Sequence, residues 1–80
     1  MNTSTAVKYR ILELCEERSL SIHRLAMLCA LPPSSIKNIL YGKSKNPTLL
    51  TIKMICDGLE ITLVDFFDTE TFRRLEPEIR

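Results

Sequence analysis

The sequence predicts an all-α domain. Apolar residues recur at helical spacing along most of the chain, and no alternating run of β-branched residues indicates a strand. Proline, serine, threonine and glycine stand where helices would begin and end. With 80 residues the chain is one small domain, so each buried apolar position matters. We therefore expect a single domain over residues 1–80 with about five helices and short links.

The first two helices are predicted at about residues 5–18 and 22–29. In the first, an apolar stripe with spacing i, i+4, i+7 and i+8 consists of Val7, Ile11, Leu14 and Cys15. Ser21 offers a side-chain cap for the second helix. The buried face of that helix would hold Ile22, Leu25, Ala26 and Cys29. Pro32 and Pro33 prevent its continuation, because the residue before a proline is pushed out of the α region.

A third helix is predicted to begin at Pro33, since a proline at the first helical position loses no hydrogen bond. Its buried side would hold Ile36, Ile39 and Leu40, and Gly42 would close it as a C-terminal glycine. The second and third helices are then joined by only three or four residues. That arrangement is typical of a helix-turn-helix.

The fourth helix is predicted to follow Thr48 as its cap. Its core positions would be Leu49, Ile52, Ile55, Cys56 and Leu59. Thr62 and Asp65 have the spacing of a capping box, which predicts a short fifth helix that buries Leu63, Phe66 and Phe67. Residues 69–75 are compatible with a further turn or two of helix before Pro77.

The charge is divided unequally along the chain. Residues 1–53 hold eight Lys and Arg against three Glu, a net charge of +5, and no acid stands between Arg18 and Lys53. Residues 54–80 hold three Arg against seven acids, a net charge of −4. This asymmetry favours one face for a polyanion and a separate face for another contact.

Several classes of function are not indicated. The three cysteines form no C-x-x-C pair and lie among apolar residues, so we interpret Cys15, Cys29 and Cys56 as small core residues in a reducing compartment. The chain has no secretory signal and no apolar run long enough for a bilayer, so we expect a cytoplasmic protein without membrane contact. No phosphate loop, metal-ligand spacing or nucleophile–base pair suggests an enzyme, and we expect no metal and no small-molecule cofactor.

Residues 11–67 resemble the lambda-repressor-like helix-turn-helix family, also called XRE. The resemblance rests on the segments ILELCEERSLSIHRLAMLCAL, SSIKNILYGKSKNPTLLTIKMI and GLEITLVDFF. Its ordered features are Ser21, Leu25, Ala26, Ile36, Ile39, Gly42, Asn46, Pro47, Thr48, Leu49, Leu59, Phe66 and Phe67. The resemblance implies a five-helix DNA-binding domain, followed here by a short acidic extension at 68–80. It also implies sequence-specific binding of duplex DNA, usually as a dimer.

In this motif the helix at about 33–41 enters the major groove, and its N-terminal residues reach base edges. The base-contacting candidates are Pro33, Ser34, Ser35, Lys37 and Asn38. Asparagine can pair bidentately with adenine, and lysine can donate to guanine or to phosphate. The phosphate-contacting candidates are Ser21, His23, Tyr41, Lys43, Ser44, Lys45 and Thr48.

Some positions depart from the family pattern. Ile22 replaces a residue that is usually polar, Ala30 replaces the turn glycine, and Pro32 replaces a Ser or Thr cap. Glu60 stands where a glycine commonly ends the fourth helix, so we expect this helix to end earlier, at Gly58. Four residues are apolar where the family is commonly polar, and they either thicken the core or form an interface: Met27, Leu28, Leu40 and Leu50.

Two functions from different classes follow. The first is a bacterial or phage-type transcriptional regulator, a repressor associated with the nucleoid. We expect it to act as a homodimer whose interface would include Leu63, Phe66, Phe67 and Phe72. The alternative is a protein-interaction or antitoxin-like module on the same fold with weak or no DNA binding. The acid-free span favours the first, whereas Ile22 and the weak net basicity favour the second.

Overall fold

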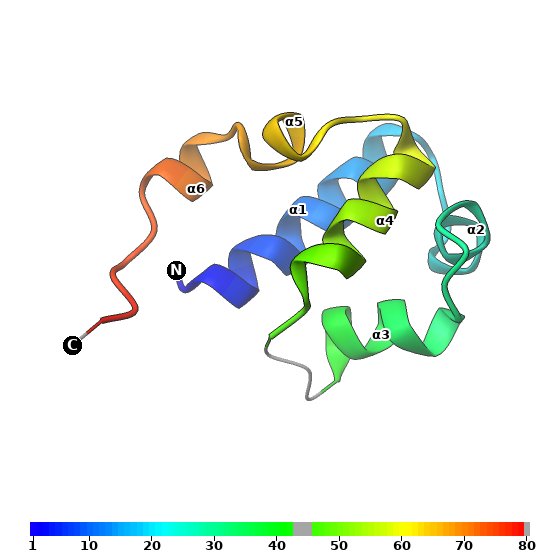
Figure 1. The fold of residues 1–80 in the computed structure, drawn as a ribbon, viewed down its shortest axis with the longest axis horizontal. Coiled ribbons are helices and arrows are strands. Elements are labelled where there is room, and N and C mark those ends of the chain that lie inside the picture. Colours follow the sequence, from blue (N-terminus) through cyan, green and yellow to red (C-terminus); the bar gives the residue numbers. More distant parts are fainter. Residues whose placement is uncertain (43–45, 80) are drawn as a thin grey trace.

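A computed structural model of the chain describes residues 1–42 and 46–79, which form six helices and no strand (Figure 1). The helices are α1 (Thr3–Glu17), α2 (Ile22–Leu28), α3 (Pro33–Tyr41), α4 (Leu49–Leu59), α5 (Leu63–Phe67) and α6 (Glu70–Arg73). The all-α class is confirmed. The short α6 lies in the C-terminal segment where a further turn of helix was expected. Helix α2 packs against α3 and α4, α5 packs against α4, and α6 packs against α1.

Side-chain caps explain where the helices begin. The Ser21 and Thr48 hydroxyls accept from the N–H groups of Arg24 and Thr51, at 3.0 and 3.1 Å. The capping box at the start of α5 is also present, because Thr62 and Asp65 accept from each other's backbone N–H. These three predictions are confirmed.

Two further caps were not anticipated from the sequence. The Asn2 side chain accepts from the N–H of Thr5 at 2.9 Å, so α1 begins two residues before its predicted start. Thr69 accepts from the N–H of Phe72 and starts α6. Both caps match the general preference for Asn and Thr at a helix N-terminus.

The ends of the helices differ from expectation at Gly42 and Glu60. Gly42 follows α3 with φ −96° and ψ −157°, so it is extended and not left-handed. Helix α4 runs to Leu59 and ends at Glu60 in the left-handed region, with φ 59°. The prediction that this helix ends earlier, at Gly58, is therefore wrong. Ala30 adopts the turn conformation with φ 56°, as its position after α2 requires.

Gly58 is needed for the close approach of two helices. A Cβ atom at this position would lie 2.7 Å from Cys29 Sγ and 2.8 Å from the carbonyl oxygen of Leu28. Real Cβ atoms do not come so near to backbone, so only glycine lets α4 pass the C-terminal end of α2 at this distance. The helix-turn-helix thus packs directly against α4.

One apolar core connects helices α1 to α5. Its largest fully buried side chains are Phe66, Ile11, Leu25, Ile36, Leu40, Ile55 and Cys56. The four unusual apolar positions divide into two groups. Leu40 is 2% exposed and belongs to the core, whereas Met27, Leu28 and Leu50 are 61%, 43% and 70% exposed.

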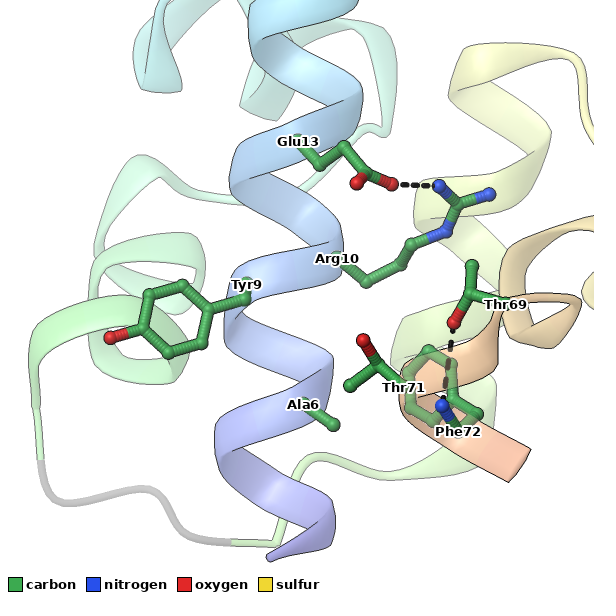
Figure 2. Close-up of a pocket in the computed structure, with 7 residues that line it drawn as sticks. All are labelled: Ala6, Tyr9, Arg10, Glu13, Thr69, Thr71 and Phe72. Carbon is green, nitrogen blue, oxygen red and sulfur yellow. Dashed lines mark hydrogen bonds and ion pairs between the residues drawn. The ribbon is translucent and has the colours of Figure 1, made fainter. Parts of the chain in front are cut away.

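Arg10 fastens α5 to α1. Its Nε donates to the carbonyl of Phe66 at 2.7 Å and its Nη2 to the carbonyl of Asp65 at 2.9 Å, and it also pairs with Glu13 (Figure 2). The guanidinium group thereby adds side-chain donors to two carbonyl oxygens near the end of α5, and the Asp65 carbonyl also accepts from the N–H of Asp68 at 3.4 Å. The hollow beside it, between α1 and α6, has a volume of about 60 Å³ and holds no more than a few waters.

Candidate DNA-binding surface

The exposed side of α3 carries the polar residues that were predicted to read bases. Ser34, Lys37 and Asn38 are exposed, and Tyr41 at the end of the helix is 65% exposed. On the opposite side, Ile36 and Leu40 are buried in the core. The helix is therefore amphipathic, with its polar face toward solvent. A helix that reads bases needs such an exposed polar face.

The start of α3 carries no side-chain cap. Pro33 is its first residue, and Pro32 before it has no side-chain acceptor. The N–H of Ser35 donates to the carbonyl of Pro32 at 2.9 Å. Pro33 and Ser35 are only half-buried, so the first turn of this helix, with its partial positive charge, reaches the surface.

Packing brings the start of α4 beside the middle of α3. A shallow hollow of about 220 Å³ is lined by Ser35, Asn38, Ile39, Asn46, Pro47, Thr48 and Thr51. Thr48 and Thr51 lie close enough to share a hydroxyl–hydroxyl hydrogen bond of 2.9 Å. Neither Asn46 nor Thr51 was predicted from the sequence to contact DNA. Thr51 could have been identified from the sequence, because it stands one helical turn after the Thr48 cap.

The remaining phosphate-contacting candidates lie at two places in the described structure. Ser21 and His23 are exposed at the start of α2, and Thr48 is exposed at the start of α4. The Ser21 oxygen accepts from the backbone of Arg24, which leaves its O–H free to donate to an anion. Lys43, Ser44 and Lys45 lie outside the residues that the structure describes.

Charged groups are separated across the molecule. Within residues 1–42 and 46–79, Arg24 and Lys37 make no ion pair, whereas Arg73 and Arg74 of the C-terminal part pair with Asp68 and Glu70. Figure 1 shows α3 at one edge of the fold and α5 and α6 at the opposite edge. These two unpaired cations therefore lie on α2 and α3, away from the acidic end.

The predicted dimer residues around α5 differ in their exposure. Phe66 has 0% exposure and packs in the core, so it has no surface to offer a partner, and this part of the prediction is corrected. Phe67 and Phe72 are half-buried, with their rings edge to face and 4.9 Å between centroids. The exposed apolar residues here are Leu49 and Val64, at 63% and 76%, so the prediction that Leu49 is a core position of the fourth helix is wrong. With Leu63 and Phe67 they line an open hollow.

The described residues give no sign of other kinds of site. They contain no group of three His, Cys, Asp or Glu residues placed to hold a metal ion. None of the helices in this part of the chain combines the length and the apolar character that a membrane crossing needs.

Comparisons with known proteins agree with this geometry. The family model described as a Cro/C1-type HTH DNA-binding domain matches residues 10–71. The crystal structure titled "Crystal structure of the prophage Lp1 protein 11" is similar, with 34% sequence identity and a TM-score of 0.80. That match covers 94% of this chain and 100% of the other. No curated protein matches the sequence. The resemblance to the lambda-repressor-like regulators is confirmed, and the chain belongs to the Cro/C1-type helix-turn-helix DNA-binding domain family.

Proposed function

We propose that this DNA-binding domain is a sequence-specific transcriptional regulator that inserts α3 into the major groove. The observation that carries the proposal is the polar face of α3, where Ser34, Lys37 and Asn38 are all exposed and Asn38 lies beside the start of α4. A helix of about 10–12 Å diameter with its side chains fits the groove, which is about 12 Å wide.

Each residue of this face has a role that follows from its chemistry. The Asn38 amide presents a donor and an acceptor side by side, which matches N6 and N7 of adenine. Lys37 donates to guanine or to a nearby phosphate. Ser34, in the first turn, is small enough to allow close approach of the backbone. Pro33 and Ser35 flank this face and fix how deeply the helix enters.

The backbone contacts would surround the reading helix. Ser21 and His23 approach one DNA strand from the start of α2, and Thr48 and Tyr41 approach the other side of the groove. Hydroxyl donors and helix N-termini are common phosphate contacts. Lys43, Ser44 and Lys45 belong to the same proposal on the ground of sequence alone.

We propose repression as the mode of regulation, with a homodimer as the active form. Occupation of a promoter site by a bound dimer is enough to exclude polymerase, and no further activity is needed. The dimer contact would be the hollow lined by Leu49, Leu63, Val64 and Phe67. Asp68 and Arg73, which pair with each other within the chain, also line this hollow.

The test separates base reading from anchoring. An operator is first selected from a random duplex pool, and each variant is titrated against it and against a scrambled duplex. Asn38→Ala should cost about 1–3 kcal/mol on the operator and much less on the scrambled DNA, because the lost contact is specific to a base. Asn46→Ala is the matched control. Asn46 is exposed, lines the same hollow as Asn38 and lies outside α3, so we propose that it faces the DNA backbone and expect equal changes on both duplexes.

Thermal stability is measured in parallel. Asn38 is exposed, so its substitution should leave the melting temperature nearly unchanged. If Asn38→Ala kept the full preference for the operator, α3 would not read bases at this position. If the wild-type chain bound no duplex at all, the interaction-module alternative would replace the regulator.

A further inference from the structure

Lys8 lies outside the helix-turn-helix, yet it reaches toward the end of the reading helix. It belongs to the first half of α1, and its ammonium nitrogen is 5.8 Å from the centre of the Tyr41 ring at the end of α3. The same nitrogen is 5.5 Å from the centre of the Tyr9 ring. Both distances fall within the range of a cation–π interaction.

A hollow separates α1 from the end of α3 at this point. Its volume is about 300 Å³, and its lining is mostly polar on the α1 side. The lining residues are Asn2, Ser4, Thr5, Lys8, Ile39, Leu40, Tyr41, Gly42 and Pro47. Gly42 and Pro47 stand on either side of residues 43–45, where we propose backbone contacts. The hollow therefore adjoins the proposed path of the DNA backbone.

Lys8 has no carboxylate partner in the described part of the chain. The nearby acid Glu78 is held elsewhere, because it accepts from the N–H and the hydroxyl of Thr3 at 3.0 and 2.9 Å. Glu78 lines a neighbouring hollow and not the one that contains Lys8. An ammonium group that is held by two rings and has no carboxylate partner in this part of the chain is a suitable ligand for an external anion.

We infer that Lys8 contacts a phosphodiester of the bound duplex from this hollow, with Tyr41 positioning its ammonium group. This inference rests on the proposed function, and it adds α1 to the elements that contact DNA. The rings limit the freedom of the lysine chain before binding, so less side-chain entropy is lost when the phosphate is bound. Because the contact is to the backbone, it adds affinity without sequence preference.

The experiment compares two charge-removing variants. The slope of log K against log salt is negative, and Lys8→Gln should reduce its magnitude by about 0.9. If the two proteins bind equally at about 1 M salt, this corresponds to a loss of roughly eightfold in affinity at 0.1 M salt. The loss should be equal on the selected and the scrambled duplex. Lys53→Gln is the control, because it removes the same charge from an exposed lysine that already pairs with Asp57. Its salt slope should equal that of the wild type.

A second comparison tests the role of the ring. When Tyr41→Leu is already present, Lys8→Gln should lower the salt slope by clearly less than it does in the wild type, because the ammonium group is no longer held in place. If Lys8→Gln lowers only the melting temperature and leaves the slope unchanged, the lysine is structural and the inference fails. A wild-type affinity that does not vary with salt would instead overturn the proposed function itself.

Discussion

At the residue scale, the three cysteines behave as small apolar side chains. Cys15, Cys29 and Cys56 are all buried and unpaired. Burial raises the pKa of each thiol, and for Cys29 it does so to about 11, with a further contribution from the neighbouring Cys15 and Cys56. Raised pKa values keep these groups as neutral thiols, so they are poor nucleophiles and poor metal ligands in the folded protein.

This arrangement predicts a loss of stability at alkaline pH. The pKa of Cys29 is about 11 in the folded protein and near its ordinary value of 9.0 in the unfolded chain. Its contribution is therefore complete below about pH 9 and is lost as the pH rises from 9 toward 11. Urea unfolding under reducing conditions should show a flatter pH dependence in this window for Cys29→Ala than for the wild type. Identical pH profiles would contradict the assignment.

Single residues also show what the sequence could not reveal about turns. Ala30 was expected in the turn after α2, and its φ of 56° agrees. Glu60 has φ 59° although a glycine stands two residues earlier. Local preference favours glycine in the left-handed region, so the sequence pointed to Gly58. The close contact between α4 and the end of α2 already required glycine there, and such a contact is invisible in a local pattern.

At the element scale, helix starts were easier to predict than helix neighbours. Ser21, Thr48 and the Thr62–Asp65 box were identified because a cap and its partner are only three residues apart. The hollow that places Asn46 and Thr51 beside Asn38 depends on how α4 lies against α3. That arrangement is set by the shared core, so the sequence pattern of either helix alone does not contain it.

The contact between α2 and α4 leads to a prediction at the same scale. Gly58→Ala should destabilise the fold by about 1–3 kcal/mol through overpacking. Helix propensity alone would predict the opposite, a gain of about 1 kcal/mol. Adding Cys29→Ala should recover part of the loss, because it removes the close contact with Sγ and leaves those with the Leu28 carbonyl group in place. Chemical denaturation of the single and double variants measures this, and a stabilised Gly58→Ala would contradict it.

At the scale of the whole molecule, the fold places a cationic, polar face and an apolar, acidic edge on different sides. The unequal distribution of charge along the sequence predicted two faces, but it did not indicate which residues lie on each face. Lys8 comes from α1 and meets Tyr41 of α3, and Glu78 from the tail meets Thr3 at the start of α1. Contacts over such sequence distances follow from the packing of the helices.

The dimer proposal gives a prediction that belongs to this scale. Val64 is 76% exposed in the hollow beside α5, so Val64→Asp should leave the monomer fold intact while it places a charge in the apolar contact, near Asp68. Sedimentation should then show a dimer for the wild type at high micromolar concentration and a monomer for the variant. Ile79→Asp is the matched control, because Ile79 is 91% exposed in the tail and outside this hollow.

The same two variants should differ in how they bind DNA. A two-fold dimer presents its α3 helices about 34 Å apart, which matches half-sites separated by about 10 base pairs. Val64→Asp should therefore lose affinity for a duplex with two half-sites and keep its affinity for a duplex with one, whereas Ile79→Asp should resemble the wild type on both. Equal losses on both duplexes would mean that Val64 acts within the monomer. If the wild-type chain stays monomeric with and without DNA, the dimer proposal is wrong and the apolar hollow does not form a dimer contact.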